Sequence, residues 1–203
     1  MSFVNTYTPP NKRDIDVSFM DPYDLNSTIP VLPILESDRV CLVPFNPAIH
    51  AEAFHMAYVA DIESIDRYFP VDWSTIDAFL AFLESFIRQD HTSVLFAIID
   101  KTRPSENPAL IPQGRVAGVI GWAHGSLAQL SMEFGPVVVL TAFQRTFVSA
   151  NAIGLLLKYV LDTPEEGGLG FRRVAWCTNP MNVASIGAAE KMGFTKEGVV
   201  SEI

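Results

Sequence analysis

The stretch SMEFGPVVVLTAFQRTFVSANAIGLLLKYVL, residues 131–161, decides the fold of this chain. Residues 130–140 are mostly apolar and contain a run of valines, which favours a β-strand. Apolar residues then recur at helical spacing from about 146 to 162, where Glu165-Glu166-Gly167-Gly168 ends the pattern. The stretch therefore predicts a strand, a short polar loop and a helix in direct succession.

The loop of this stretch has two interpretations. The first N–H groups of a helix have no partner within the helix, and together with the helix dipole they suit a pyrophosphate. Arg145 can add a charge-assisted hydrogen bond to a phosphate. The loop holds no glycine, however, so the stretch is also typical of an ordinary buried strand that precedes an amphipathic helix.

The segments on either side predict an α+β fold. Strands are expected at 38–45, 93–100, 116–123 and 172–178, and helices at 48–60, from Ser74 or Thr75 onward, and at 182–192. Gly193 would cap the last helix. Because the order is an antiparallel run of strands followed by one parallel crossover, we expect a mixed, largely antiparallel sheet flanked by helices.

The length and charge of the chain limit its classes of function. Its 203 residues suffice for one domain, with residues 1–36 as an extended N-terminal arm and residues 37–203 as the folded domain. A net charge of −9 argues against a nucleic-acid binder. The same charge fits a cationic substrate such as an amine. Many cytosolic proteins are also acidic simply for solubility, so this alternative stays open.

Neither the cysteines nor the histidines predict a metal site. Cys41 and Cys177 lack metal-ligand and disulfide spacing, and both stand in apolar runs where we expect them to be buried. The four histidines are scattered, and His124 is expected in a solvated loop just after the strand 116–123. No apolar stretch reaches the roughly 20 residues that span a bilayer, and residues 1–10 do not resemble a signal peptide. We therefore expect a cytoplasmic protein without membrane contact.

A polar pair follows the last predicted strand. Asn182 suits the N-cap of the final helix, and Ser185 would face the same side of its first turn. Near the end of a strand, this pair can reach a ligand that lies between two splayed strands. Alternatively, Asn182 only caps the helix and Ser185 only bonds to local backbone.

Together these stretches resemble the RimJ/RimL-like branch (ribosomal-protein-alanine acetyltransferases) of the GCN5-related N-acetyltransferases (GNAT). The matching pieces are Glu133-Phe134-Gly135, Gln144-Arg145-Thr146, Arg172-Arg173 with Trp176, Asn182 with Ser185, Ala188 to Phe194, and Glu197-Gly198. Asp38 to Phe45 resembles the opening strand of the family, and the resemblance runs from about residue 37 to the C-terminus. It implies the GNAT fold, with splayed middle strands in the sheet, acetyl-CoA as co-substrate and no metal.

The resemblance also implies roles by position. The backbone of the strand 136–140, which includes Val137, Val138 and Val139, would bind the pantetheine arm of the coenzyme. The pyrophosphate would lie against Gln144, Arg145, Thr146, Phe147, Val148 and Ser149. Asn182 would contact the coenzyme or the reacting region. Glu133 would act as the base on the amine, directly or through water, and Ser185 as the general acid for the leaving thiolate.

The chain departs from the family pattern at several positions. Phe147 and Ser149 stand where the family commonly has glycine, and Ala189 stands where many relatives have a tyrosine general acid. The last strand of the family has no counterpart before Ile203.

Two functions remain open after this comparison. One is an acetyl-CoA-dependent N-acetyltransferase acting on a primary amine, of a small molecule or a protein N-terminus, by direct attack in a ternary complex. The other is a non-catalytic relative that binds coenzyme A or a protein partner. An oligomer is possible, but the sequence does not predict one.

Overall fold

The computed structural model describes residues 22–200 of the chain. Its strands are β1 (Leu35–Glu36), β2 (Val40–Pro44), β3 (Val94–Asp100), β4 (Arg115–Ser126), β5 (Ser131–Val139) and β6 (Arg173–Trp176). Its α-helices are α1 (Pro47–Val59), α2 (Ile62–Ile65), α3 (Ile76–Phe82), α4 (Phe147–Leu161) and α5 (Val183–Lys191). The π-helix η3 (Leu83–Arg88) extends α3, and short 3-10 turns form η2 (Asp66–Tyr68), η4 (Thr141–Phe143) and η5 (Pro164–Glu166).

The strands form one sheet in the order β1-β2-β3-β4-β5-β6. Neighbouring strands are antiparallel except β5 and β6, which are parallel. Parallel neighbours cannot be joined by a tight turn, and α4 provides the crossover between them. The predicted mixed, largely antiparallel sheet is confirmed.

The strands β5 and β6 separate part-way along their length. Ser131–Phe134 of β5 pairs with Arg173–Trp176 of β6. β5 continues to Val139, and within residues 22–200 this second half pairs with β4 alone. The splayed middle strands implied by the resemblance are therefore present, and they leave one side of the β5 backbone without a partner strand.

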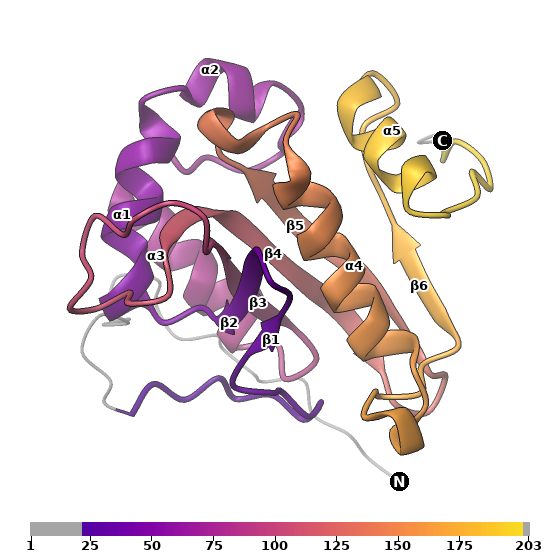
Figure 1. Cartoon of the computed structure of the whole chain (residues 1–203). Helices are drawn as coiled ribbons and strands as arrows, with labels where there is room; N and C mark the ends of the chain where they lie inside the picture. The colour runs from indigo at the N-terminus through magenta and orange to yellow at the C-terminus, as the bar shows by residue number, and fades with distance from the viewer. Residues whose placement is uncertain (1–21, 201–203) are drawn as a thin grey trace, which may run out of the picture.

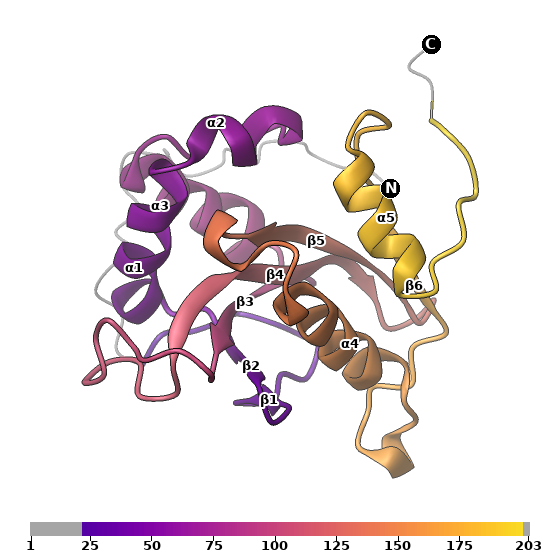
Figure 2. The same cartoon turned by 45° about the horizontal axis from the view of Figure 1, so that its top comes forward.

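The longer helices cover both faces of the sheet. α4 lies across one face, whereas α1 and α3 lie together on the other (Figures 1 and 2). On the α4 side, Trp122 of β4 lies beside Tyr159, with ring centroids 6.4 Å apart. α5 stands at the end of β6, and Phe194, which follows α5, packs against Trp176 of β6 with ring centroids 5.5 Å apart.

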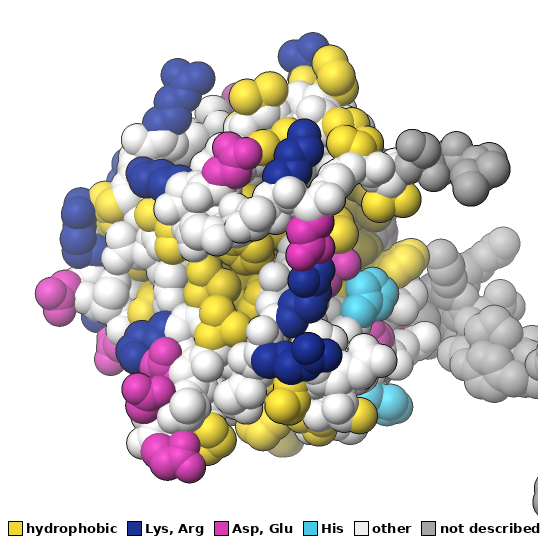
Figure 3. Space-filling model, turned by 90° about the vertical axis from the view of Figure 1, so that its right-hand side faces the viewer, with side chains coloured by type: hydrophobic (Ala, Val, Ile, Leu, Met, Phe, Trp, Pro, Cys, Tyr) yellow, Lys and Arg dark blue, Asp and Glu magenta, His cyan; other side chains and the backbone are white. Residues whose placement is uncertain are grey.

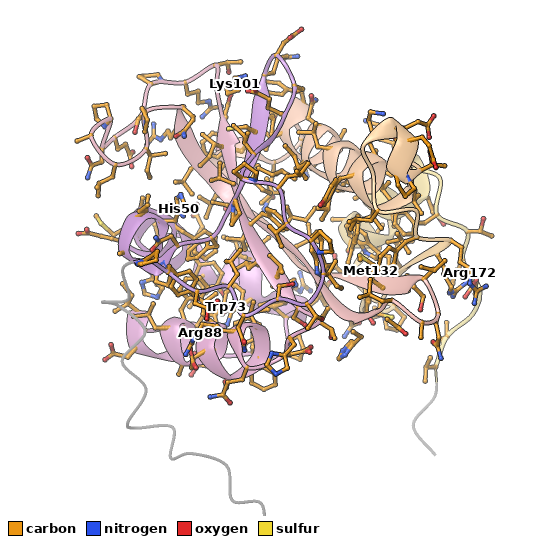
Figure 4. The ribbon with its side chains drawn as sticks, turned by 90° about the horizontal axis from the view of Figure 1, so that it is seen from below. His50, Trp73, Arg88, Lys101, Met132 and Arg172 are labelled. Carbon is orange, nitrogen blue, oxygen red and sulfur yellow. The ribbon has the colours of Figure 1, made fainter. Side chains whose placement is uncertain are left out.

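An aromatic cluster forms the core on the α1–α3 side. Its fully buried centre is Trp73, whose ring lies within 6.2 Å of those of Phe54, Tyr58, Phe69, Phe79 and Phe82. Burial of such large rings contributes strongly to the stability of a protein core. Figure 4 shows Trp73 and Arg88 in this layer, well apart from Met132 and Arg172 on the side of β6. The aromatic layer therefore supports the face of the sheet that α1 and α3 cover.

Three local expectations differ from the structure. β4 runs on to Ser126 because its end pairs with the start of β5, so His124 lies inside the strand, exposed, with a φ of 54°. Leu35, placed in the predicted arm, pairs with Leu42 as part of β1. Cys177 is exposed because β6 ends one residue before it. Residues 1–21 of the predicted arm lie outside the described residues.

β6 lies at the edge of the sheet. Within residues 22–200 no strand follows α5, so β6 has a neighbour on one side alone. Figure 3, which faces this side of the molecule, shows hydrophobic side chains gathered in a hollow with charged side chains around its rim. Among the described residues no helix is long and apolar enough to cross a membrane.

Candidate functional site

Beyond Phe134, the edge of β5 that faces away from β4 has no partner strand among residues 22–200, and we call this unpaired backbone edge the slot. The N–H of Leu140 donates to the carbonyl of Ala117 (2.9 Å), which directs the backbone of Leu140 and, by alternation, Val138 toward β4. The N–H and C=O groups of Val137 and Val139 therefore point the other way, into the slot. An extended ligand with amide groups can bond to them as an additional strand would.

A side chain from the loop closes one end of this slot. The amide Nε2 of Gln144 donates to the carbonyl of Val139 at 3.0 Å. Gln144 is exposed, and this bond links the loop to the last residue of β5. Of the two strand residues that face the slot, Val137 therefore keeps both backbone groups available.

The N-terminus of α4 begins directly beyond the slot. Thr146 is its N-cap, accepting from the N–H of Val148 (3.2 Å) and donating to the carbonyl of Phe143 (2.6 Å). Arg145 precedes it with a left-handed φ of 58°. Within residues 22–200 the N–H groups of Arg145 and Thr146 donate to no carbonyl. These two amides and the positive end of the helix dipole suit an anion, whereas the amide of Val148 is already bonded.

An arginine far away in the sequence lies at the same helix terminus. The guanidinium of Arg39, in the turn between β1 and β2, lies over the ring of Phe147 with Cζ 3.3 Å from the centroid. Stacking holds a planar guanidinium while leaving its N–H edge free to bond. Among the described residues neither Arg39 nor Arg145 takes part in an ion pair. Two uncompensated positive charges therefore flank the start of α4.

Glu133 lies where β5 and β6 are still paired, one residue before the last paired position of β5. It stands opposite Ala123 of β4 and Ala175 of β6, two small side chains that leave room around its carboxylate. Alternation along β6 places Cys177 on the same face as Ala175. Desolvation by the neighbouring groups, together with the charge of Glu133 and a hydrogen bond to it, raises the pKa of the Cys177 thiol. The protonated thiol thus donates to Glu133, which has no ion pair within residues 22–200.

The predicted polar pair lies at the start of α5. Asn182 is the N-cap, and its Oδ1 accepts the N–H of Ser185 at 3.1 Å. The hydroxyl of Ser185 accepts a second hydrogen bond, from the indole Nε1 of Trp176 at 3.0 Å. Ser185 is therefore fixed through both its backbone and its side chain, beside the residue where β6 ends.

Acidic side chains lie in the connector between α1 and α3. In Figures 1 and 2 this connector and α5 stand on opposite sides of the carboxyl end of β5. Asp66 accepts a hydrogen bond from the hydroxyl of Tyr58, and burial, reinforced by the charge of Asp72, raises the pKa of Asp66. Among residues 22–200 no three His, Cys, Asp or Glu side chains come together as metal ligands.

Comparison with known families identifies the family to which the chain belongs. Residues 39–195 match the sequence model of the family described as Acetyltransferase (GNAT) domain. The chain is a GNAT-family N-acetyltransferase. The match covers the slot, the N-terminus of α4, Glu133 and Ser185, so the residues of the candidate site lie inside the family domain.

Solved structures agree with this assignment. A GCN5-related N-acetyltransferase from Brucella melitensis is 27% identical, with a TM-score of 0.68 over 83% of this chain and 70% of that one. RimJ from Mycobacterium smegmatis, solved with CoA-disulfide, is 16% identical, with a TM-score of 0.61 over 78% and 71%. An acetyltransferase from Salmonella typhimurium that modifies the N-terminal serine of ribosomal protein L7/L12 is 16% identical, with a TM-score of 0.65 over 81% and 86%. At this level of identity, the last two show that the chain shares their fold. Among curated protein sequences none matches.

Two partners of the site were not predicted from the sequence. Arg39 is 108 positions from Phe147, and no local pattern links an arginine in a β-turn to a helix that begins so far along the chain. Trp176 was part of the family resemblance, but its hydrogen bond to Ser185 was not predicted. Nothing in the sequence indicates that a serine nine positions after a strand tryptophan will bond to it, because the contact forms only when the strand and the helix pack together.

Proposed function

We propose that this N-acetyltransferase transfers the acetyl group of acetyl-CoA to a primary amine. The single observation that carries this proposal is the continuity of the slot with the N-terminus of α4. Unpaired strand backbone at Val137 leads to free amides at Arg145 and Thr146 and to the guanidinium of Arg39. The strand backbone can bond to the amides of pantetheine, and the free amides and the guanidinium beyond it can bond to the phosphates, in the order in which these groups occur along the coenzyme.

The reacting end of the coenzyme would lie where β5 and β6 separate. Glu133 takes a proton from the attacking amine, directly or through one water. A backbone N–H that faces the slot stabilises the negative charge on the carbonyl oxygen in the transition state. Ser185 gives a proton to the departing sulfur. Most of the acceleration comes from holding the two substrates in contact, since the chain needs no covalent intermediate.

The acceptor is a cation in solution that must lose a proton. Asp66, Asp72 and Glu133 supply negative charge on the acceptor side, and the net charge of −9 attracts amines over a longer range. The L7/L12 acetyltransferase acts on a protein N-terminus, which favours a peptide α-amine as the first acceptor to be tried. We take residues 37–203 as the catalytic domain and residues 1–36 as its N-terminal arm.

Calorimetric titration with acetyl-CoA tests the coenzyme half of this proposal. We expect saturable binding in the micromolar range, followed by thiol release when peptide N-termini, polyamines and free amino acids are supplied. Absence of binding at high micromolar coenzyme would refute the proposed site. Binding without thiol release for any acceptor would instead support the non-catalytic alternative.

Replacing Arg39 with Gln is expected to weaken acetyl-CoA binding about tenfold, because a charged hydrogen bond to phosphate contributes about 1.5 kcal/mol or more. Phe147→Leu should cause a smaller loss, since it removes the ring under the guanidinium and keeps the helix apolar there. Arg172→Gln is the matched control, because Arg172 is exposed and bonds to the carbonyl of Gln129 at the other end of β6. Equal affinity of the Arg39 and Arg172 variants would contradict this role.

A further inference from the structure

The hydrogen bond between Trp176 and Ser185 differs from the environment of the other two indole groups. The Nε1 atoms of Trp73 and Trp122 are buried and find no acceptor among residues 22–200. The Nε1 of Trp176 lies 3.0 Å from the hydroxyl oxygen of Ser185. An indole N–H can only donate, so the serine oxygen must be the acceptor.

This direction of donation fixes where the proton of Ser185 can go. A hydroxyl has one proton to donate and two lone pairs to accept with. The indole occupies one lone pair, so the hydroxyl proton is directed away from Trp176. The backbone N–H of Ser185 is already bonded to Asn182. Among the described residues the hydroxyl donates to no acceptor, so its proton is free to bond to a ligand.

Packing keeps the indole in place. Trp176 is the last residue of β6 and pairs with Phe134 of β5. Its ring meets Phe194 edge to face at 5.5 Å, and Phe194 also lies 6.5 Å from the ring of Phe134. The chain reaches Phe194 through Gly193, whose φ of 92° ends α5, and the N–H of Phe194 bonds to the carbonyl of Ala189. The strand end and both ends of α5 are therefore held together around Trp176.

We propose that Trp176 is a positioning residue that orients the hydroxyl of Ser185 toward the sulfur of the departing coenzyme. This inference rests on the proposed function and extends it from Ser185 to the residue behind it. Donation by the indole also stabilises negative charge on the serine oxygen as its proton leaves, which makes the hydroxyl a better acid.

The amine nitrogen forms a bond to the acetyl carbon, and its extra proton passes to Glu133. The bond between carbon and sulfur breaks, and the sulfur receives the proton of Ser185. The serine oxygen, held by the indole N–H, regains a proton from Glu133 through solvent, so both side chains return to their starting state.

A double-mutant cycle tests the proposal. We expect Trp176→Phe, which keeps the ring and removes the N–H, to lower kcat about tenfold while KM for acetyl-CoA changes less than about twofold. Ser185→Ala should lower kcat at least as much, and the double variant should be no slower than Ser185→Ala alone. Trp73→Phe is the matched control, because it removes an indole N–H that bonds to no serine. Its kcat per folded molecule should stay at the wild-type value.

A second readout does not depend on turnover. With ¹⁵N-labelled indole groups, the Trp176 resonance should shift in Ser185→Ala and again when coenzyme A is added, while those of Trp73 and Trp122 stay in place. Additive effects of the two substitutions on kcat, or an unchanged kcat in Trp176→Phe, would overturn the proposal and leave the proposed function intact. A wild-type protein that releases no thiol with any acceptor would overturn both.

Discussion

Replacement of Glu133 by Gln is expected to lower kcat for acetyl transfer at neutral pH by about 100-fold or more, the usual effect of removing a general base. Gln fills the same space between Ala123 and Ala175 and keeps an oxygen that can accept from Cys177, so the fold and the KM for acetyl-CoA should stay near their wild-type values. The lost function is proton removal alone. Steady-state kinetics of thiol release with a saturating amine measures it.

The pH dependence of the same variant separates a base from a structural residue. An amine acceptor loses its own proton as the pH rises, so the defect of Glu133→Gln should shrink toward alkaline pH. Glu190→Gln is the matched control, since Glu190 is exposed on α5 and makes no ion pair within residues 22–200. A Glu133 variant that is as active as this control, or equally defective at every pH, would show that the carboxylate is not the base.

The substitution Gly118→Ala is expected to destabilise the fold by about 3 kcal/mol, at the upper end of what overpacking usually costs. A Cβ at position 118 would lie 2.1 Å from the carbonyl oxygen of Val138 and 3.0 Å from the Cα of Val139. Both are backbone atoms, so no side-chain rotation relieves the contact. Because these residues belong to the slot, we expect weaker acetyl-CoA binding as well. Denaturant unfolding followed by coenzyme titration of the folded protein measures both effects.

Gly154→Ala provides the opposite control within the same chain. Gly154 lies in the interior of α4, and a Cβ there would meet just the Cε of Met192 at 3.5 Å, an ordinary contact. Glycine in a helix interior is less favourable than alanine, so this change should stabilise the protein by about 0.5–1 kcal/mol. If Gly118→Ala and Gly154→Ala unfold at the same denaturant concentration, the close approach of β4 to β5 does not make a Cβ at position 118 destabilising, and the prediction is wrong.

The sequence by itself determined most of the helices and strands, including the strand–loop–helix at 131–161, but it did not predict β1. Val137 to Val139 predict a strand, and the spacing beyond Thr146 predicts a helix, because side-chain periodicity is a local property. Thr75 and Asn182 were predicted as caps or cap candidates for the same reason, whereas the N-cap role of Thr146 came from the structure. The boundary of β4 was wrong by three residues because pairing with β5, and not local preference, extends it.

Only the tertiary structure decided how the site is assembled. The approach of Arg39 to Phe147, of Trp176 to Ser185, and of Cys177 to Glu133 depends on how strands and helices pack across the sheet. The same packing decided that the Val148 amide is bonded to its own cap, while those of Arg145 and Thr146 bond to no carbonyl within residues 22–200. Contacts between residues distant in the chain follow from burying apolar surface as a whole, and no local pattern records them.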